Sequence, residues 1–208
     1  MPPVDFSLLL VTDRHRTHGR SLPSVLQQAV EAGLPAIQLR ERDLPTSELL
    51  RLAQEIRSIT SPRAVPLIIN DRVDLMLALN LDGVHLRANS LPVADVRRMA
   101  GADRLIGLST HSLAEVRQAN RDGADYVVFG PIFDTPSKRQ FGSPVGLEQL
   151  AEACRLSAIP VFAIGGVTGA SAPDVLRAGS HGIAVIGSIL DQEDAAVATR
   201  AMMAALMP

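Results

Sequence analysis

The sequence predicts an α/β protein, a single-domain TIM (β/α)8 barrel that spans residues 1–208. Short runs rich in Val, Ile and Leu alternate along the whole chain with longer amphipathic stretches that have helical spacing. The apolar runs have no polar face, which is typical of parallel strands covered on both sides. A chain of 208 residues is compact for this fold, near the lower limit of ~200 residues for a TIM barrel.

Eight successive strand and helix units follow from this pattern. The expected strands comprise residues 6–11, 36–40, 67–70, 83–86, 105–109, 126–130, 161–164 and 182–186. The expected helices comprise residues 23–32, 47–59, 73–78, 93–99, 113–121, 147–156, 172–178 and 191–206. Capping residues precede several helices, including Thr46 with Ser47, and Ser112 with Glu115 three residues later. No segment remains for a second domain.

A doubly wound open sheet is the alternative architecture for eight such units. That fold favours a GxGxxG sequence in the first turn between strand and helix, and this chain has none. Two glycine-containing sites instead follow the seventh and eighth expected strands, at Gly165-Gly166 and Gly187-Ser188. Because TIM barrels often bind phosphate at these two strand ends, the barrel is the preferred prediction.

Composition and charge exclude several classes of function. A formal net charge of -2 gives no general attraction to nucleic acid or to acidic membranes. The apolar runs are far shorter than the ~20 residues of a membrane-spanning helix, and the first residues do not resemble a signal peptide. The single cysteine, Cys154, cannot form an internal disulfide. We therefore expect a cytoplasmic protein with small-molecule partners, and neither nucleic acid nor membrane as a partner.

The second expected strand ends in polar residues, at the edge where α/β enzymes place their catalytic groups. Alternation along the strand directs Gln38, Arg40 and Arg42 to the same side. Two guanidinium groups there can chelate a diphosphate or triphosphate in a fork geometry that lysine lacks. The alternative is a ring of ion pairs at the barrel rim, in which Glu41 neutralises these arginines.

The third expected strand ends at Asn70 and Asp71. The amide can bind a heteroatom ring or a phosphate oxygen, and the carboxylate can bind a divalent cation. Magnesium needs only one or two carboxylates when substrate phosphates complete its coordination. The sequence therefore predicts a Mg2+ site at Asp71. The alternative is that both residues cap the helix that begins near Val73.

Hydroxyl and cationic residues follow the fifth and sixth expected strands. Ser109 offers a hydroxyl to an anion, and residues 131–142 form a long segment that contains Thr135, Ser137 and Lys138. Long connections in compact domains are often lids or binding loops, although a solvated surface loop is the alternative. At the next two strand ends, backbone without side chains at Gly166 and Gly187 allows amide N–H groups to approach a phosphate.

Three other candidates have less specific patterns. His85 lies within an apolar strand, and we expect a hydrogen-bonded barrel residue there rather than a catalytic base. His15 and His18 lie in an arginine-rich segment after the first strand and at most help to hold anions. The sequence contains no zinc-binding pattern, Ser-His-Asp arrangement or P-loop.

Seven motifs occur in collinear order over nearly the whole chain. They read LVTD at 10–13, QLRERD at 38–43, IINDRVD at 68–74, DGVHL at 82–86, GADY at 123–126, FGPIF at 129–133 and AIGGV at 163–167. As a set they resemble the thiamine-phosphate synthase / TenI-like superfamily, whose fold is a TIM barrel. The resemblance implies a transferase of thiamine biosynthesis that couples hydroxymethylpyrimidine pyrophosphate to thiazole phosphate and releases pyrophosphate, with magnesium as cofactor.

The resemblance also implies a role for each matching residue. It assigns the pyrimidine pyrophosphate to Gln38, Arg40, Arg42 and Asn70, the metal to Asp71, and the pyrophosphate to Ser109 and Lys138. It assigns the thiazole side to Thr135, Pro136 and Ser137, and the thiazole phosphate to Gly166, Ile186 and Gly187. Arg40, Ser109 and Lys138 are the expected catalytic residues. A reaction in which the C–O bond breaks early needs mainly stabilisation of the leaving group and orientation.

The chain departs from the family pattern at three places. After GVHL the synthase pattern has Gly-Gln-Asp/Glu-Asp, whose last Asp is a second metal ligand, but this chain has Arg87-Ala88-Asn89-Ser90. A guanidinium at Arg87 can neutralise the leaving group instead. Arg42 replaces the usual lysine, which preserves charge but not shape, and Gly187 replaces the usual serine.

Two other functions remain alternatives at this stage. A TenI-like thiazole tautomerase uses a histidine next to the glycine that ends the sixth strand, and Pro131 occupies that position here. A non-catalytic TenI-like barrel that binds a phosphorylated ligand is consistent with the missing second carboxylate. The sequence does not determine the oligomeric state, and a homodimer is compatible with it.

Overall fold

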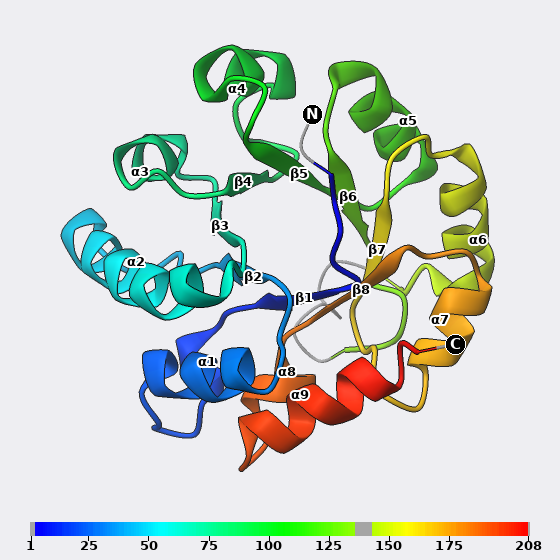
Figure 1. Cartoon of the computed structure of the whole chain (residues 1–208). Helices are drawn as coiled ribbons and strands as arrows, with labels where there is room; N and C mark the ends of the chain where they lie inside the picture. The colour runs from blue at the N-terminus through cyan, green and yellow to red at the C-terminus, as the bar shows by residue number, and fades with distance from the viewer. Residues whose placement is uncertain (1–2, 136–142, 208) are drawn as a thin grey trace.

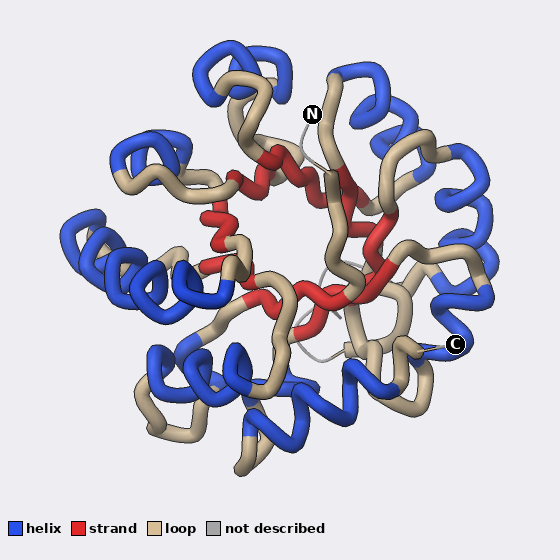
Figure 2. Tube along the Cα trace, in the orientation of Figure 1, coloured by secondary structure: helices blue, strands red, loops and turns tan. Residues whose placement is uncertain are grey.

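Eight parallel strands close into a barrel in the computed structural model, which describes residues 3–135 and 143–207 (Figures 1 and 2). The strands are β1 (Leu8–Val11), β2 (Ile37–Leu39), β3 (Leu67–Asn70), β4 (Gly83–Leu86), β5 (Leu105–Thr110), β6 (Tyr126–Phe129), β7 (Val161–Ile164) and β8 (Gly182–Val185). Each strand pairs with its neighbours in chain order, and β8 pairs with β1. The predicted TIM barrel is confirmed. The alternative of an open sheet is wrong, because the pairing of β8 with β1 leaves no free edge.

Helices surround this barrel and cover the outer faces of the strands (Figure 2). They are α1 (Leu22–Glu31), α2 (Thr46–Thr60), α3 (Val73–Ala78), α4 (Val93–Ala100), α5 (Leu113–Asp122), α6 (Gly146–Leu156), α7 (Ala172–Arg177), α8 (Gly187–Leu190) and α9 (Ala195–Ala204), with two 3-10 turns, η1 (Arg14–Arg16) and η2 (Ser61–Arg63). Within the described residues, no helix is long and apolar enough to cross a membrane. Apart from the last helix, the predicted bounds differ from the observed ones by at most two residues.

The C-terminal helix differs from its predicted form. One helix was expected over residues 191–206, but α8 ends at Leu190 and α9 begins only at Ala195. Asp194 caps α9, because its carboxylate accepts a hydrogen bond of 2.9 Å from the backbone N–H of Val197. The chain therefore turns between the two helices, where the apolar pattern alone indicated continuous helix.

One of the two predicted helix caps is confirmed. The Ser112 hydroxyl accepts a hydrogen bond of 3.3 Å from the backbone N–H of Glu115 at the start of α5. The prediction of a cap at Thr46 and Ser47 is wrong, because α2 begins directly after Pro45 and no side chain caps it.

The core has two parts, because successive strand residues point to opposite faces of the barrel wall. In β1, Leu8 and Leu10 belong to the cluster between strands and helices, whereas Leu9 and Val11 belong to the cluster inside the barrel. This explains why the strands have no polar face. Inside the barrel, aromatic rings pack together: the Phe162 ring centroid lies 5.2 Å from that of Phe6 and 5.6 Å from that of Tyr126.

Candidate active site

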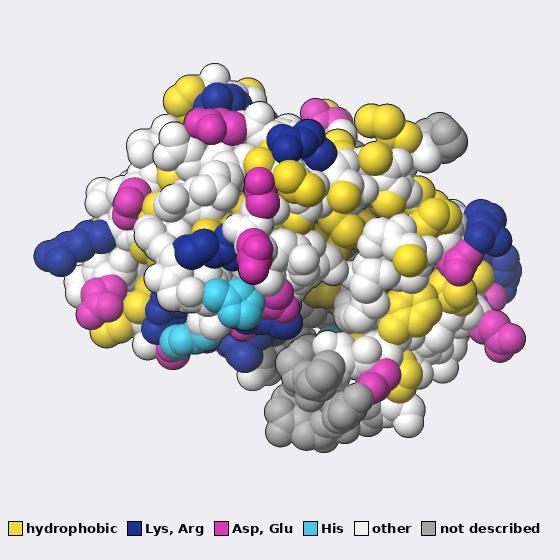
Figure 3. All heavy atoms as spheres, turned by 90° about the horizontal axis from the view of Figure 1, so that it is seen from below, with side chains coloured by type: hydrophobic (Ala, Val, Ile, Leu, Met, Phe, Trp, Pro, Cys, Tyr) yellow, Lys and Arg dark blue, Asp and Glu magenta, His cyan; other side chains and the backbone are white. Residues whose placement is uncertain are grey.

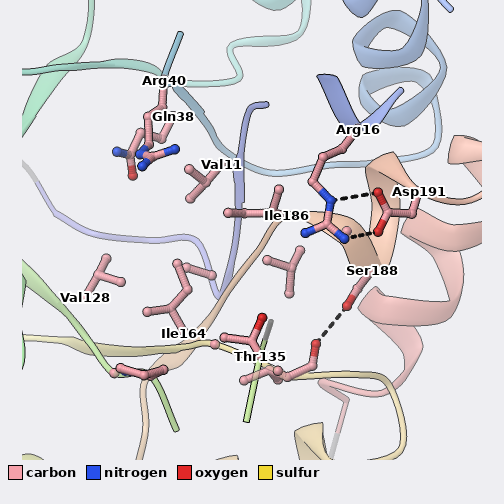
Figure 4. A pocket seen from close by; sticks show the side chains of 18 of the residues that line it. Val11, Arg16, Gln38, Arg40, Val128, Thr135, Ile164, Ile186, Ser188 and Asp191 are labelled. Carbon is pink, nitrogen blue, oxygen red and sulfur yellow. Dashed lines mark hydrogen bonds and ion pairs between the residues drawn. The ribbon is translucent and has the colours of Figure 1, made fainter. Parts of the chain in front are cut away.

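A pocket of about 1140 Å3 lies at the carboxyl ends of the strands (Figure 4). All eight strands, or the residues directly after them, contribute to its lining. The sequence-predicted residues in this lining are Gln38, Arg40, Arg42, Asn70, Ser109, Thr135, Gly166, Ile186 and Gly187. The tertiary structure thus brings together side chains from distant segments of the chain. Pro136, Ser137 and Lys138 lie outside the described residues.

Glu41 does not neutralise the two arginines beside it in the sequence. Its buried carboxylate accepts a hydrogen bond of 2.7 Å from the Thr12 hydroxyl, and bonds of 3.2 Å from the backbone N–H and the guanidinium of Arg14. Within the described parts of the chain, no carboxylate forms an ion pair with Arg40 or Arg42. The alternative of a neutralising Arg–Glu ring is therefore wrong for these two residues.

Arg14 is the centre of a separate ion-pair cluster after β1. Its guanidinium lies 2.6 Å from the Asp43 carboxylate, and the His15 ring lies 3.0 Å from the same group. The space-filling view shows histidine, basic and acidic side chains side by side on the surface (Figure 3). These pairs engage the acidic residues that follow β2, so Arg40 and Arg42 have no ion-pair partner among the described residues.

The surroundings of Arg40 lower the pKa of its guanidinium. Burial lowers the pKa of its guanidinium, and the positive charges of Arg42 and Arg87 lower it further, against the opposing effect of Asp13 and Glu41. A guanidinium remains protonated in proteins. Arg40 is therefore a partly desolvated positive charge, and because it has no ion-pair partner among the described residues it is available to a bound anion.

Gln38 in β2 and Asn70 at the end of β3 form a buried amide pair. The Gln38 Nε2 group donates a hydrogen bond of 3.2 Å to Asn70 Oδ1. This orientation leaves the Asn70 NH2 group as a donor for the pocket. Neither Asn70 nor Asp71 caps α3, because the capping position is Arg72 and no side chain bonds there. The helix-cap alternative is therefore wrong.

Asp71 is engaged by other side chains. Its Oδ2 atom accepts a hydrogen bond from the Arg87 guanidinium, and its Oδ1 atom accepts one from the Ser90 hydroxyl. It lies in a small neighbouring cavity of about 240 Å3 that Arg42 and Arg87 also line. In residues 3–135 and 143–207, no three His, Cys, Asp or Glu side chains gather to hold a metal ion. In this arrangement the donor set does not fit a magnesium ion, because the one carboxylate is already bound to a cation.

His85 lies inside the barrel, almost completely buried, and contributes to the lining of the pocket. Its Nε2 atom is 2.9 Å from Ser109 Oγ, and its Nδ1 atom is 3.2 Å from Tyr126 Oη. Burial lowers the pKa of His85 to about 3, so the imidazole is neutral at physiological pH. A Cβ at Gly107 would lie 2.4 Å from Tyr126 Oη and 2.6 Å from His85 Nδ1, so only glycine leaves room for these rings. His85 is a hydrogen-bonded barrel residue, as predicted.

The ends of β7 and β8 form the glycine-rich side of the pocket. Gly165 and Gly166 have φ values of +97° and +66°, and a Cβ on Gly165 would lie 2.5 Å from that of Pro131. The backbone of β7 can therefore pass close to the segment after β6 only because these residues are glycines.

Arg16 and Asp191 close the pocket wall beside Gly187. The Arg16 Nε donates a hydrogen bond of 2.8 Å to Asp191 Oδ1, and a second bond joins the same two groups (Figure 4). A Cβ on Gly187 would lie 2.5 Å from the Arg16 guanidinium. Sequence reasoning missed this pair, because its members are 175 positions apart and no local pattern links them.

Comparison with known proteins agrees with this geometry. The family model described as thiamine monophosphate synthase matches residues 8–189. The chain belongs to this family. The thiamine-phosphate synthase of Chloroflexus aurantiacus is 43% identical to this chain, over 97% of this chain and 93% of the relative. The thiamine-phosphate synthase of Roseiflexus castenholzii is also 43% identical, over 93% of this chain and 85% of the relative. The family predicted from the motifs is thereby confirmed.

Solved structures show the same relationship. The thiamine phosphate pyrophosphorylase of Pyrococcus furiosus has a TM-score of 0.88 and 33% identity, over 96% of this chain and 95% of its own. A 3-hexulose-6-phosphate synthase has a TM-score of 0.72 at 16% identity, so that likeness shows the fold alone.

Proposed function

We propose that this thiamine monophosphate synthase family member couples hydroxymethylpyrimidine pyrophosphate to thiazole phosphate. In this reaction the C–O bond between the pyrimidine methylene and pyrophosphate breaks, and the thiazole nitrogen forms a C–N bond to that carbon. The observation that supports the proposal most directly is the pair of unneutralised arginines, Arg40 and Arg42, in a pocket that Ser109 and Asn70 also line. A multiply charged leaving group is the ligand that such a pocket fits.

The arginine side of the pocket would hold the pyrophosphate. Arg40 and Arg42 provide fixed positive charge, and Ser109 provides a hydroxyl donor. Because these donors are in place before the C–O bond breaks, they stabilise the charge that develops on the leaving group without reorganisation. Lys138, outside the described residues, is proposed as a further pyrophosphate ligand on the resemblance alone.

The remaining residues would orient the two substrates. The buried Gln38–Asn70 amide pair offers donors and acceptors to the pyrimidine ring or its phosphates. On the opposite side, backbone amides near Gly166 and Gly187 would bind the thiazole phosphate. The full proposed thiazole side comprises Thr135, Pro136, Ser137, Gly166, Ile186 and Gly187.

Asp71, the expected magnesium ligand, is paired with Arg87. Members of this family generally use Mg2+, and Asp71 is the residue that the motif assigns to it. Here that carboxylate would have to release Arg87 before it could bind an ion. We propose that the Arg87 guanidinium provides positive charge at this edge of the pocket, beside Arg40 and Arg42. Metal binding at Asp71 remains a prediction from the family pattern.

Product formation distinguishes the candidate functions. Purified protein is incubated with both substrates, and thiamine phosphate and pyrophosphate are measured together. A synthase forms both products in equal amounts only when both substrates are present. Binding of the substrates by calorimetry without product would identify a phosphate-binding barrel, and conversion of the thiazole compound alone would identify a tautomerase. A cytoplasmic location and a homodimer remain predictions from the sequence.

A further inference from the structure

A chain of three polar side chains runs from the barrel interior to the pocket. Tyr126 Oη, His85 and Ser109 Oγ follow one another at 3.2 Å and 2.9 Å. Tyr126 and His85 are buried, whereas Ser109 lies at the pocket surface. His85 also lines the pocket but is only 2% exposed, whereas Tyr126 is not among the lining residues, so Tyr126 is linked to a bound anion through His85 and the Ser109 hydroxyl.

The direction of these hydrogen bonds follows from counting protons. A neutral imidazole has one N–H group and one acceptor nitrogen. Either Nδ1 donates to Tyr126 and Nε2 accepts from Ser109, or Nδ1 accepts from Tyr126 and Nε2 donates to Ser109. In the first arrangement the Ser109 hydrogen points into the barrel, and in the second it is free to point into the pocket.

Tyr126 selects between these arrangements. Its hydroxyl is fully buried, and His85 Nδ1 is its one hydrogen-bond partner among the described residues. If Nδ1 donated, the tyrosine O–H would be buried without an acceptor, which is unfavourable. The tyrosine therefore donates to Nδ1, and the imidazole hydrogen is on Nε2.

We propose that Tyr126 and His85 are positioning residues that keep the Ser109 hydroxyl oriented as a donor to a bound phosphate oxygen. Because Ser109 Oγ accepts the hydrogen bond from His85, its own hydrogen remains available to the ligand. This inference rests on the proposed role of Ser109 in pyrophosphate binding. Burial also lowers the pKa of His85, which maintains the neutral ring that the arrangement requires.

Nuclear magnetic resonance of the wild-type protein tests the proton position directly. With 15N-labelled histidine, correlations between ring nitrogens and ring hydrogens identify the nitrogen that bears the hydrogen. We expect the hydrogen of His85 on Nε2. A hydrogen on Nδ1 would overturn the inference, and this measurement needs no variant to fold.

Pyrophosphate titration tests the consequence for binding. Tyr126→Phe removes the donor to Nδ1 without touching the pocket, and we expect its dissociation constant for pyrophosphate to rise about fivefold, the effect of one hydrogen bond. In a Ser109→Ala background the same substitution should have no further effect. An equal loss in that background would show a general packing defect and overturn the inference. Thr60→Val, which removes a buried hydroxyl far from the pocket, is the matched control.

These measurements also separate the inference from the proposed function. Pyrophosphate binding does not depend on turnover. If the titrations behave as expected but no thiamine phosphate forms from the two substrates, the proposed function fails and the positioning role stands. If thiamine phosphate forms but Tyr126→Phe binds pyrophosphate like the wild type, the function stands and the positioning role is overturned.

Discussion

The Arg87 guanidinium and the Asp71 carboxylate form an ion pair between the ends of β4 and β3. The Ser90 hydroxyl binds the other oxygen of the same carboxylate. Asp71 therefore holds in place a cation that belongs to the protein. We therefore expect Arg87 to supply positive charge to a bound anion when no magnesium is present.

Arg87→Ala is expected to weaken pyrophosphate binding about tenfold without added metal, because one charge-assisted hydrogen bond is lost. The substitution also frees Asp71, so added magnesium should restore part of the affinity. Calorimetric titration of pyrophosphate with and without Mg2+ measures both effects. Arg98→Ala is the control, because Arg98 is exposed and, in the described part of the chain, its ion-pair partner is Asp95 on its own helix. Wild-type affinity that depends strongly on Mg2+ and is unchanged by Arg87→Ala would contradict the expectation.

Arg40→Gln should lower activity without a loss of stability, whereas Arg14→Gln should lower stability. Loss of Arg40 should lower kcat/KM about a hundredfold, as expected for removal of a transition-state donor. The thermal midpoint of this variant should stay the same or rise, because a partly buried cation without an ion-pair partner among the described residues is removed. Loss of Arg14 leaves the buried Glu41 carboxylate with fewer donors and should cost about 1–3 kcal/mol of stability.

Steady-state kinetics and urea unfolding on the same preparations compare this pair of variants. If Arg40→Gln proves as destabilising as Arg14→Gln, then Arg40 has a structural role and the assignment to the leaving group is wrong.

Gly165→Ala should be much more destabilising than Gly33→Ala. Both glycines have a φ of +97°, so both alanines meet the same unfavourable backbone conformation, at about 1–2 kcal/mol. A Cβ on Gly33 has no atom within 4 Å, whereas one on Gly165 meets Pro131 Cβ at 2.5 Å and Pro131 Cα at 2.7 Å. We expect overpacking to add about 1–3 kcal/mol at Gly165 alone. Urea unfolding of the two variants measures this difference. Equal destabilisation would mean that the segment around Pro131 can move away from the added Cβ at no cost in stability.

Because His85 is buried, the folded protein should lose stability in acid. Its pKa is about 6.5 when unfolded and, because of burial, about 3 in the folded protein. The unfolded state therefore binds more protons between these values, and stability falls as the pH drops below 6.5. At pH 5 the loss from this residue should be about 2 kcal/mol relative to pH 8. Urea unfolding at both pH values compares the wild type with His85→Gln, which has no such titration. Equal losses in the two proteins would exclude His85 as the cause.

The fold could be predicted from the sequence because its signals are local. Each strand is a short apolar run and each helix has its own periodicity, so every unit is visible without knowledge of its neighbours. The positions of Arg40, Asn70 and Ser109 followed from the same pattern, since each lies at the end of an expected strand, and alternation along the strand placed Gln38 on the same side as Arg40. The start of α9 was missed, because the apolar spacing extends back to residue 191 and only the cap at Asp194 sets where the helix begins.

The sequence alone determined the eight strand–helix units, the family, and the set of polar residues at one end of the barrel. Only the tertiary structure decided which charges neutralise one another. Glu41 pairs with Arg14 and not with Arg40, Asp71 holds Arg87, and Arg16 meets Asp191 when β8 closes against β1. The physical reason is that apolar periodicity can be recognised within one segment of the sequence, whereas an ion pair forms only when two groups lie within a few ångströms of each other in space. Only closure of the barrel sets such distances between remote segments.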